Sequence, residues 1–280
     1  LSEEIARTIG YDNIKSMPLS LNTSMHQQKN IVSKIEDFFV EHGFSEVINF
    51  PFTDNDEKKS ISIDNPLDSN RNNLRTSLKN SLIENLLYNE RRQKDSIKLF
   101  EISDVYLKNS NILQEKKLGI IVSGRCDHNY EDFSKNLDRS YLDEVLGFNK
   151  APIFNIEEVS RENLKTKRKE KIFYAEVCVD DIPETFFRSI TTKKSLINFV
   201  KYQPVSEYPS SSRDFSFSIE SPKQYNNVIS SIQNFHDDNL KDFFIFDFYI
   251  NKKNGEIKVG VRLIFQSTLC TLSEAESKKY

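Results

Sequence analysis

Glycine is scarce in this sequence. Only 7 of the 280 residues are glycine, about a third of the roughly 7% that is usual in proteins. None of the seven belongs to a G-x-G-x-x-G pattern or to a P-loop. Folds that hold phosphates on glycine-rich loops are therefore excluded as candidates.

Cysteine and histidine are also few, and tryptophan is missing. The cysteines are too far apart for a Cys-x-x-Cys zinc site or a disulfide framework, and the histidines show no metal-ligand spacing. The pattern fits a reducing compartment. The residues concerned are Cys126, Cys178 and Cys270, and His26, His42, His128 and His236.

The sequence has neither a long apolar run nor an excess of charge of one sign. No stretch approaches the ~18 apolar residues of a membrane span, and no signal peptide is recognisable, so we expect no membrane partner. With 39 Lys and Arg against 42 Asp and Glu, the net charge is −3. Any contact with nucleic acid must therefore come from a local basic patch.

The first 200 residues are patterned as helices and strands of an α+β fold. Leu1, Ile5 and Ile9 predict a helix that ends at Gly10, and since the chain starts within this helix, we interpret it as part of a longer protein. One layer of helices against an antiparallel sheet fits residues 20–200. The predicted helices are 24–42 (with a Ser24–Gln27 capping box), 76–92, 141–147 and a turn at 181–187; the predicted strands are 44–52, 97–107, 117–123 and 172–179.

A Pro-Ser stretch at 208–212 indicates a domain boundary. After it we predict strands at 214–219, 243–250 and 258–266, and helices at 225–235 and 273–280. This β-α-β-β-α order supplies five of the six elements of a ferredoxin-like unit. We interpret the missing last strand as truncation.

Three groups of residues carry a family resemblance. They are residues 3–14; Asn65-Pro66-Leu67 with residues 74–78 and 99–102; and Tyr208-Pro209 with Arg213-Asp214, residues 246–249 and Thr271-Leu272. Their order and spacing resemble the C-terminal portion of the bacterial and organellar type of phenylalanyl-tRNA synthetase beta subunit.

The resemblance implies a domain map and a function. Residues 1–18 would end a magnesium-motif domain, 19–203 would form a catalytically inactive class II synthetase-like domain, and 204–280 a ferredoxin-fold anticodon-binding domain. The chain would be the non-catalytic beta subunit of phenylalanine–tRNA ligase. It would bind tRNA(Phe), but no DNA, and pair with an alpha subunit that uses ATP, in a heterotetramer of two alpha and two beta subunits. The expected location is the cytoplasm, or alternatively the plastid stroma or another organelle.

The middle domain has lost the residues that would hold ATP. Active class II synthetases use an arginine two residues before the position of Glu101, because a guanidinium binds a phosphate with two hydrogen bonds. Here that position is Leu99, and the glycine-rich third motif is absent. We therefore expect no catalytic residue in this chain, and a packed ion-pair network among Arg75, Glu101 and Asp104.

Strand periodicity predicts an open sheet face in the last domain. We expect Phe244, Phe246, Phe248 and Ile250 to pack on the helices together with Val259, Val261, Leu263 and Phe265. Phe243 and Ile245 would lie on the opposite, open face, which would carry Asp247, Tyr249, Lys258 and Arg262.

The predicted open face has the chemistry to bind a single-stranded RNA loop. Tyr249 offers a ring on which a base stacks, Asp247 accepts hydrogen bonds from guanine, and Lys258 and Arg262 meet phosphates. The resemblance gives Asp247 and Tyr249 the role of reading the first anticodon base. Lys258 stands where relatives have a serine that helps to bind that base. A salt-bridged surface without RNA is the alternative.

Two further assignments leave alternatives open. Glu3 and Glu4 match the paired glutamates of the family's Mg²⁺ motif, whose aspartates would precede Leu1; the alternative is that they complement a helix dipole. The apolar stripe of helix 24–42 or of helix 74–86 faces a partner subunit, or both stripes are core. The rival functions are a stand-alone RNA-binding module and a self-sufficient synthetase.

Overall fold

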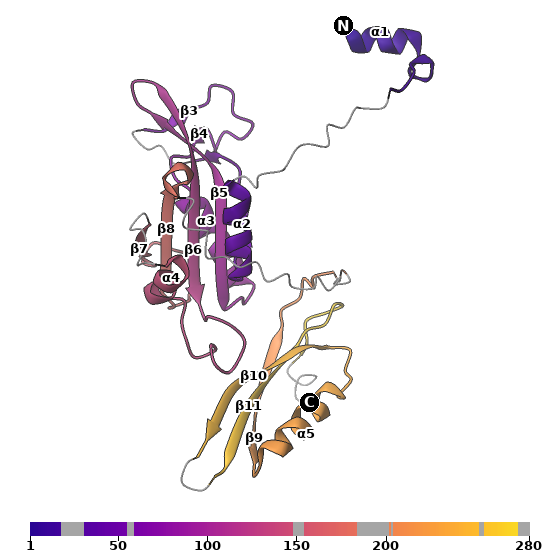
Figure 1. Ribbon diagram of the computed structural model, residues 1–280, viewed down its shortest axis with the longest axis vertical. Helices are drawn as coiled ribbons and strands as arrows, with labels where there is room; N and C mark the ends of the chain where they lie inside the picture. The colour runs from indigo at the N-terminus through magenta and orange to yellow at the C-terminus, as the bar shows by residue number, and fades with distance from the viewer. Residues whose placement is uncertain are drawn as a thin grey trace. The chain divides into compact units, whose positions relative to one another are not determined.

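The computed structural model describes residues 1–17, 31–54, 59–147, 154–183, 202, 204–251 and 255–273 (Figure 1). The chain divides into two units, Leu1–Asn30 and Ile31–Tyr280. In the first unit, α1 (Ser2–Ile9) is followed by a 3₁₀ turn at Tyr11–Asn13. Gly10, with φ of 86°, ends α1 as predicted, because a residue with a Cβ rarely adopts that conformation.

A five-stranded sheet forms the centre of residues 31–183. Its order is β1-β5-β6-β8-β7, and all its pairs are antiparallel except β1 with β5. The long β5–β6 hairpin pairs along its whole length, from Ser96 with Gly124 to Lys108 with Ile112. The strands are β1 (Ser45–Glu46), β5 (Ser96–Lys108), β6 (Ile112–Gly124), β7 (Asn155–Val159) and β8 (Ile172–Cys178).

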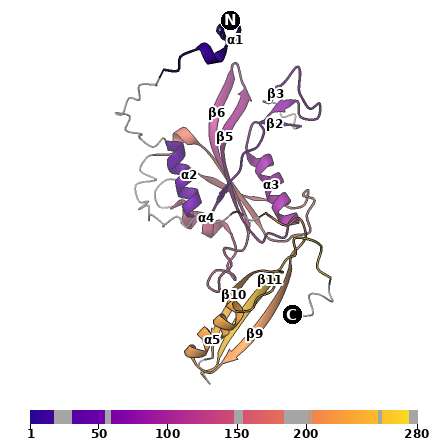
Figure 2. The same ribbon diagram turned by 90° about the vertical axis from the view of Figure 1, so that its right-hand side faces the viewer.

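Helices cover both faces of this sheet (Figure 2), so the prediction of a single helical layer is wrong. On one face, α2 (Ile31–Glu41) and α4 (Arg139–Leu146) pack against Phe100 and Ile120. On the other, α3 (Lys79–Arg91) packs against Leu99 and Ile121. The reason is that β5 and β6 place apolar side chains on both faces of the sheet.

The apolar stripes of α2 and α3 are both core. Ile35 and Phe39 of α2, and Leu82 and Leu86 of α3, are completely buried against the sheet. The prediction that one of these stripes faces a partner subunit is therefore wrong for residues 31–41 and 79–91. The start of the 24–42 helix, with its predicted capping box, lies outside the described residues.

The strand predicted at 44–52 is mostly irregular. Only β1 pairs with the main sheet, and Ile48 and Phe50 are 90% and 76% exposed. Beyond Pro51, which lacks an N–H to donate, a small sheet of order β2-β4-β3 forms. Its strands are β2 (Phe52–Thr53), β3 (Ile61–Ser62) and β4 (Asn73–Leu74).

Most other predicted elements of this part are confirmed, with ends that shift by a few residues. The helix predicted at 76–92 begins later, at Lys79. A 3₁₀ turn at Val179–Asp181 lies near the helical turn predicted at 181–187, and the last residues of that prediction lie outside the described part. Strand β7 was not predicted, because two polar residues separate Ile156 from Val159, a spacing that does not follow the period of two of a strand.

The C-terminal residues form a three-stranded antiparallel sheet of order β10-β11-β9 with one helix. Tyr225, Val228 and Ile232 of the helix pack on Val259 and Val261 of the sheet. The predicted β-α-β-β order is confirmed, and the helix predicted at 273–280 lies almost entirely outside the described residues. The elements are β9 (Ser211–Ile219), α5 (Pro222–Gln233), β10 (Leu240–Ile250) and β11 (Ile257–Phe265).

Candidate nucleic-acid interface

Leu99 occupies the sheet position at which the family resemblance would place an ATP-binding arginine. Its side chain is 6% exposed and belongs to the cluster that α3 closes with Leu78 and Leu82. A Cβ added to Gly119 would lie 2.9 Å from Cδ1 of Leu82, so α3 rests directly on β6. This part of the sheet face is filled by hydrocarbon, and its residues do not fit a nucleotide.

A buried ion pair lies next to Leu99. Arg75 Nη1 donates to Glu101 Oε1 over 2.8 Å, and the side chains are 6% and 1% exposed. Asn49 donates its amide Nδ2 to the other carboxylate oxygen over 2.8 Å. Arg75 Nε donates to the backbone carbonyl of Asp104, whose carboxylate accepts instead from Gln114. The predicted network is thus confirmed for Arg75 and Glu101, while Asp104 joins it through its backbone.

A second polar network holds the start of α3. The Glu176 carboxylate accepts hydrogen bonds from Ser77 Oγ, from the Leu78 backbone N–H and from Lys117 Nζ at 2.8–2.9 Å, and a further one from Tyr174 Oη. Burial opposes the ionisation of Glu176, but these hydrogen bonds outweigh it and lower the pKa of the carboxyl. The carboxylate stays charged and satisfies an N–H at the helix start.

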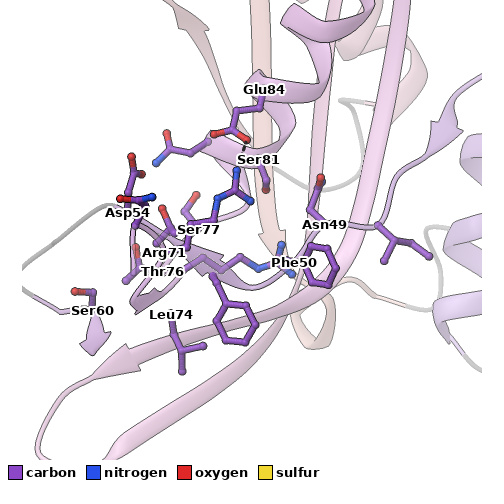
Figure 3. A pocket seen from close by; sticks show the side chains of 16 residues that line it. Asn49, Phe50, Asp54, Ser60, Arg71, Leu74, Thr76, Ser77, Ser81 and Glu84 are labelled. Carbon is purple, nitrogen blue, oxygen red and sulfur yellow. Dashed lines mark ion pairs between the residues drawn. The ribbon is translucent and has the colours of Figure 1, made fainter. Parts of the chain in front are cut away.

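A cavity of about 370 Å³ opens between the small sheet and the first turns of α3 (Figure 3). Two arginines line it, and both are paired with carboxylates: Arg71 with Glu84 at 3.8 Å and Arg75 with Glu101. Among the described lining residues, the cavity therefore offers hydroxyls, amides, rings and the Asp54 carboxylate, but no unpaired cation. We assign it no ligand.

Glu3 and Glu4 lie exposed at the start of α1, and both pair with Arg7. The nearest oxygen–nitrogen distances are 2.9 Å from Glu3 and 3.8 Å from Glu4. No group of three histidine, cysteine or acidic side chains with metal-binding geometry occurs in the described part of the chain. Two carboxylates shared with an arginine do not by themselves fit a Mg²⁺ ion, which needs a fuller set of oxygen ligands.

A β-bulge in β10 decides which side chains face α5. The pairing with β11 runs from Phe243–Leu263 to Ile245–Val261, shifts by one residue, and continues from Asp247–Gly260. Before the bulge, Phe243 and Ile245 pack on the α5 side. The bulge inserts Phe246 and so reverses the alternation.

The predicted faces are therefore wrong for residues 243–246 and right for 247–250. Phe243 and Ile245 lie on the α5 side, whereas Phe244 pairs with Arg262 on the open face. The ring of Phe246 lies over Gly260 on that same open face. Beyond the bulge, Phe248 and Ile250 pair with Val259 and Ile257 on the α5 side. Strand β11 keeps the predicted alternation, with Val259 and Val261 buried.

The four predicted residues do share the open face. Tyr249 pairs directly with Lys258, and Asp247 with Gly260. Tyr249 is 55% exposed. Asp247 and Lys258 are also exposed, and neither makes a hydrogen bond or ion pair with any described residue. A ring, a carboxylate and an ammonium group are thus available to a ligand on neighbouring positions of two strands.

Arg262, the fourth residue, is engaged within the sheet. Its Nε and Nη2 donate to the two carboxylate oxygens of Asp214, each over 2.7 Å. These hydrogen bonds lower the pKa of Asp214 and raise that of Arg262. The guanidinium also lies 5.5 Å from the ring centre of Phe246. The sequence did not predict that Asp214 and Phe246 contact Arg262, because the register that places Asp214 of β9 beside Arg262 cannot be read from the residue pattern.

Two stretches of the chain match known protein families. Residues 14–178 match the "Phenylalanyl tRNA synthetase beta chain CLM domain", and residues 206–280 match the "Ferredoxin-fold anticodon binding domain". Together with the α+β architecture, these matches define a protein of the aminoacyl-tRNA synthetase class. The chain belongs to the phenylalanyl-tRNA synthetase beta chain family.

Curated relatives carry the corresponding name. The chain is 26% identical to the chloroplastic phenylalanine–tRNA ligase beta subunit of Porphyra purpurea, over 98% of this chain and 43% of the relative. It is 27% identical to the beta subunit of Carboxydothermus hydrogenoformans and 28% identical to that of Thermotoga maritima, over 99% and 100% of this chain and 40% of each relative. The chain thus spans about two fifths of the length of these relatives.

Among the described helices, none has the length and apolar character needed to cross a membrane.

Proposed function

We propose that this chain acts as the non-catalytic beta subunit of a phenylalanine–tRNA ligase. In the complex it supports the ATP-dependent attachment of phenylalanine to tRNA(Phe), and its C-terminal sheet binds the anticodon. The observation that carries the proposal is the open face of β10 and β11 in a domain of the anticodon-binding family. On this face the side chains of Asp247, Tyr249 and Lys258 make no hydrogen bond or ion pair with any described residue.

Each of these side chains has a separate part in the proposed recognition. The Tyr249 ring stacks on a base, a contact worth about 1–3 kcal/mol. The Asp247 carboxylate accepts from the Watson–Crick edge of the first anticodon base, and Lys258 meets a phosphate or donates to that base. Arg262 donates hydrogen bonds to phosphates from the N–H groups that it does not use in its pair with Asp214.

An alpha subunit carries the activation chemistry in this proposal. The packing of Leu99 beneath α3 supports it, since the middle module then has no place for the ATP α-phosphate. We propose a heterotetramer of two alpha and two beta subunits, with domains at 1–18, 19–203 and 204–280. Mg²⁺ belongs to the complex as the ion that accompanies ATP; Glu3 and Glu4 would ligate it only together with further oxygen donors.

The proposed compartment is the cytoplasm, with the plastid stroma or another organelle as the alternative. The bacterial relatives support the cytoplasm, and the chloroplastic relatives support the alternative.

Tyr249→Ala in the complex with the alpha subunit tests the anticodon assignment. We expect tRNA(Phe) affinity to fall about 5- to 150-fold, the loss that corresponds to one stacked base. Phenylalanine-dependent pyrophosphate exchange should be unchanged. Tyr249→Phe should keep the affinity, and Tyr11→Ala, which removes a ring of similar exposure (60%), is the matched control. An unchanged affinity for Tyr249→Ala would refute the assignment.

Copurification from the native cell separates the proposal from the alternative, a stand-alone RNA-binding module with a ferredoxin-like sheet. A synthetase alpha subunit should be recovered with the full-length protein. Recovery of the chain alone, with tRNA binding intact, would favour the stand-alone module.

A further inference from the structure

Two basic segments meet at one end of the five-stranded sheet. One is the loop between β7 and β8, and the other is the last turn of α3 with the residues that follow it. We call their cations the basic ridge: Arg91, Arg92, Lys94, Lys165, Lys167, Arg168, Lys169 and Lys171. All are exposed except the half-buried Arg168. The ridge stands out in a chain whose net charge is −3.

A buried ion pair joins the two segments. Glu90, near the end of α3, is 4% exposed in its side chain and accepts hydrogen bonds from Arg161 Nη2 over 2.7 Å and Nη1 over 3.2 Å. Thr166 Oγ1 donates to the same carboxylate over 2.9 Å. Thr166 lies between Lys165 and Lys167, and Glu90 directly precedes Arg91. The hydrogen bonds therefore hold the lysines of the loop beside the arginines of the helix.

Further hydrogen bonds fix the loop to the sheet. Arg161 Nη2 also donates to Ser123 Oγ over 3.0 Å, and Ser123 donates to the Lys171 carbonyl over 2.9 Å. Arg161 Nε donates to the Glu170 carbonyl. Both ends of the loop are thus tied down, so the backbone that carries the cations is held at the edge of the sheet.

Most of the ridge is not neutralised by the protein. Lys171 pairs with Glu158 at 2.9 Å and Arg168 with Glu170 at 3.8 Å. The other six cations make no ion pair with any described residue. The guanidinium of Arg92 stacks 3.4 Å from the ring centre of Tyr88, and its Nη1 donates to the Tyr88 carbonyl over 3.4 Å. These two contacts hold the cation at the end of α3.

Exposed cations held side by side repel one another to the extent that water and salt do not screen them, and a bound polyanion removes this repulsion. Hydrophobic burial does not explain these lysines, because their side chains are exposed. The phosphate backbone of RNA supplies charges at regular intervals, and Lys and Arg contact them without reading sequence. We infer that the basic ridge is a second RNA-binding surface of this chain, which contacts the backbone of the tRNA away from the anticodon. This inference rests on the proposed function for the identity of the RNA.

The test compares two sets of lysines with equal charge. The ridge variant is Lys165→Gln/Lys167→Gln/Lys169→Gln. The control variant is Lys15→Gln/Lys108→Gln/Lys116→Gln, which removes the same charge from exposed positions elsewhere. Binding is measured on the full chain, across a range of salt concentrations, with tRNA(Phe) and with a minihelix made of its acceptor and T arms, which lacks the anticodon.

We expect the ridge variant to bind both RNAs about tenfold more weakly at low salt. The slope of log affinity against log salt should become smaller by about two, because each lost phosphate contact lowers this slope by ~0.7–0.9. An unrelated tRNA should lose the same factor. The control variant should behave as wild type. Arg91→Gln/Lys94→Gln changes the other half of the ridge and should act in the same direction if the loop variant is poorly folded.

The outcomes separate this inference from the proposed function. Tyr249→Ala should weaken binding of tRNA(Phe) and leave the minihelix unaffected. If Tyr249→Ala acts as expected while the ridge and control variants are alike, the ridge is not an RNA surface and the proposed function stands. If the ridge variant keeps its RNA affinity but no longer copurifies with an alpha subunit, the ridge is a protein interface and the inference is overturned.

Discussion

The ring of Phe246 covers Gly260 across the β10–β11 pair. A Cβ built on Gly260 would lie 2.9 Å from Phe246 Cζ and 2.9 Å from Asp247 Cβ. The glycine therefore gives the bulged strand the space to place both Phe246 and Asp247 on the open face. The position of the proposed base-reading carboxylate depends on a residue that has no side chain.

Gly260→Ala should destabilise the C-terminal sheet by about 1–3 kcal/mol, the usual cost of overpacking. The Asp247 Cβ is attached to backbone and cannot move aside as a flexible side-chain end would. Denaturant unfolding of the full chain measures the effect. Ser216→Ala, which changes the exposed residue paired with Gly260 on β9, should lie within about 0.5 kcal/mol of wild type. Equal stability of the two variants would contradict the close contact.

Arg75→Ala should destabilise the middle module by about 3–5 kcal/mol, because it leaves the buried Glu101 carboxylate without its cation. Arg71→Ala is the matched control: its pair with Glu84 is exposed and 3.8 Å long, so its loss should cost about 0–1 kcal/mol. Chemical denaturation compares the two variants.

The double variant Arg75→Met/Glu101→Leu should recover much of the stability that Arg75→Ala loses, since no uncompensated charge then remains buried. A double variant no more stable than Arg75→Ala would show that the ion pair is not the source of the loss.

Glu176→Gln should flatten the acid side of the stability profile. The pKa of Glu176 in the folded chain is below its ordinary value of 4.5, so the unfolded chain takes up the proton first as the pH falls. The stability due to the carboxylate is therefore fully present above about pH 5 and is lost as the pH falls through and below 4.5.

We expect Glu176→Gln to be less stable than wild type at pH 7 by about 1–3 kcal/mol, with the difference shrinking toward pH 3. Thermal unfolding at several pH values measures it. Glu115→Gln, which removes the other carboxylate near Lys117 at 3.9 Å, should leave the profile nearly unchanged. A constant difference between Glu176→Gln and wild type at all pH values would count against a lowered pKa.

Lys258→Gln should reduce the salt dependence of tRNA(Phe) binding more than Arg262→Gln. A lysine that meets one phosphate contributes about one to the slope of log affinity against log salt, whereas the charge of Arg262 is already balanced by Asp214. Binding titrations at several salt concentrations give the slopes. Equal slopes for the two variants would mean that RNA displaces Asp214 from Arg262.

The amino-acid sequence determined the elements and the family. Leucines at a spacing of four predicted the core of α3, local residue patterns predicted β5, β6, β8, β9 and β11, and Gly10 predicted the end of α1, because each of these signals is local. Three separated groups of residues, in the right order, were enough to indicate the beta chain family. Leu99 alone excluded an ATP-binding arginine.

The tertiary structure decided how these elements face one another. The bulge at Phe246 interrupts the alternation of the strand. A prediction with a strict period of two contains no such interruption, so it placed Phe243–Phe246 on the wrong faces. Three other features depend on contacts between residues far apart in the chain. They are the helices on both sides of the main sheet, the pairing of Arg262 with Asp214 on another strand, and the link between Arg91 and Lys165 through Glu90 and Thr166. Such contacts arise only when the chain packs, because the register and burial that create them are properties of the whole fold and not of any local stretch of sequence.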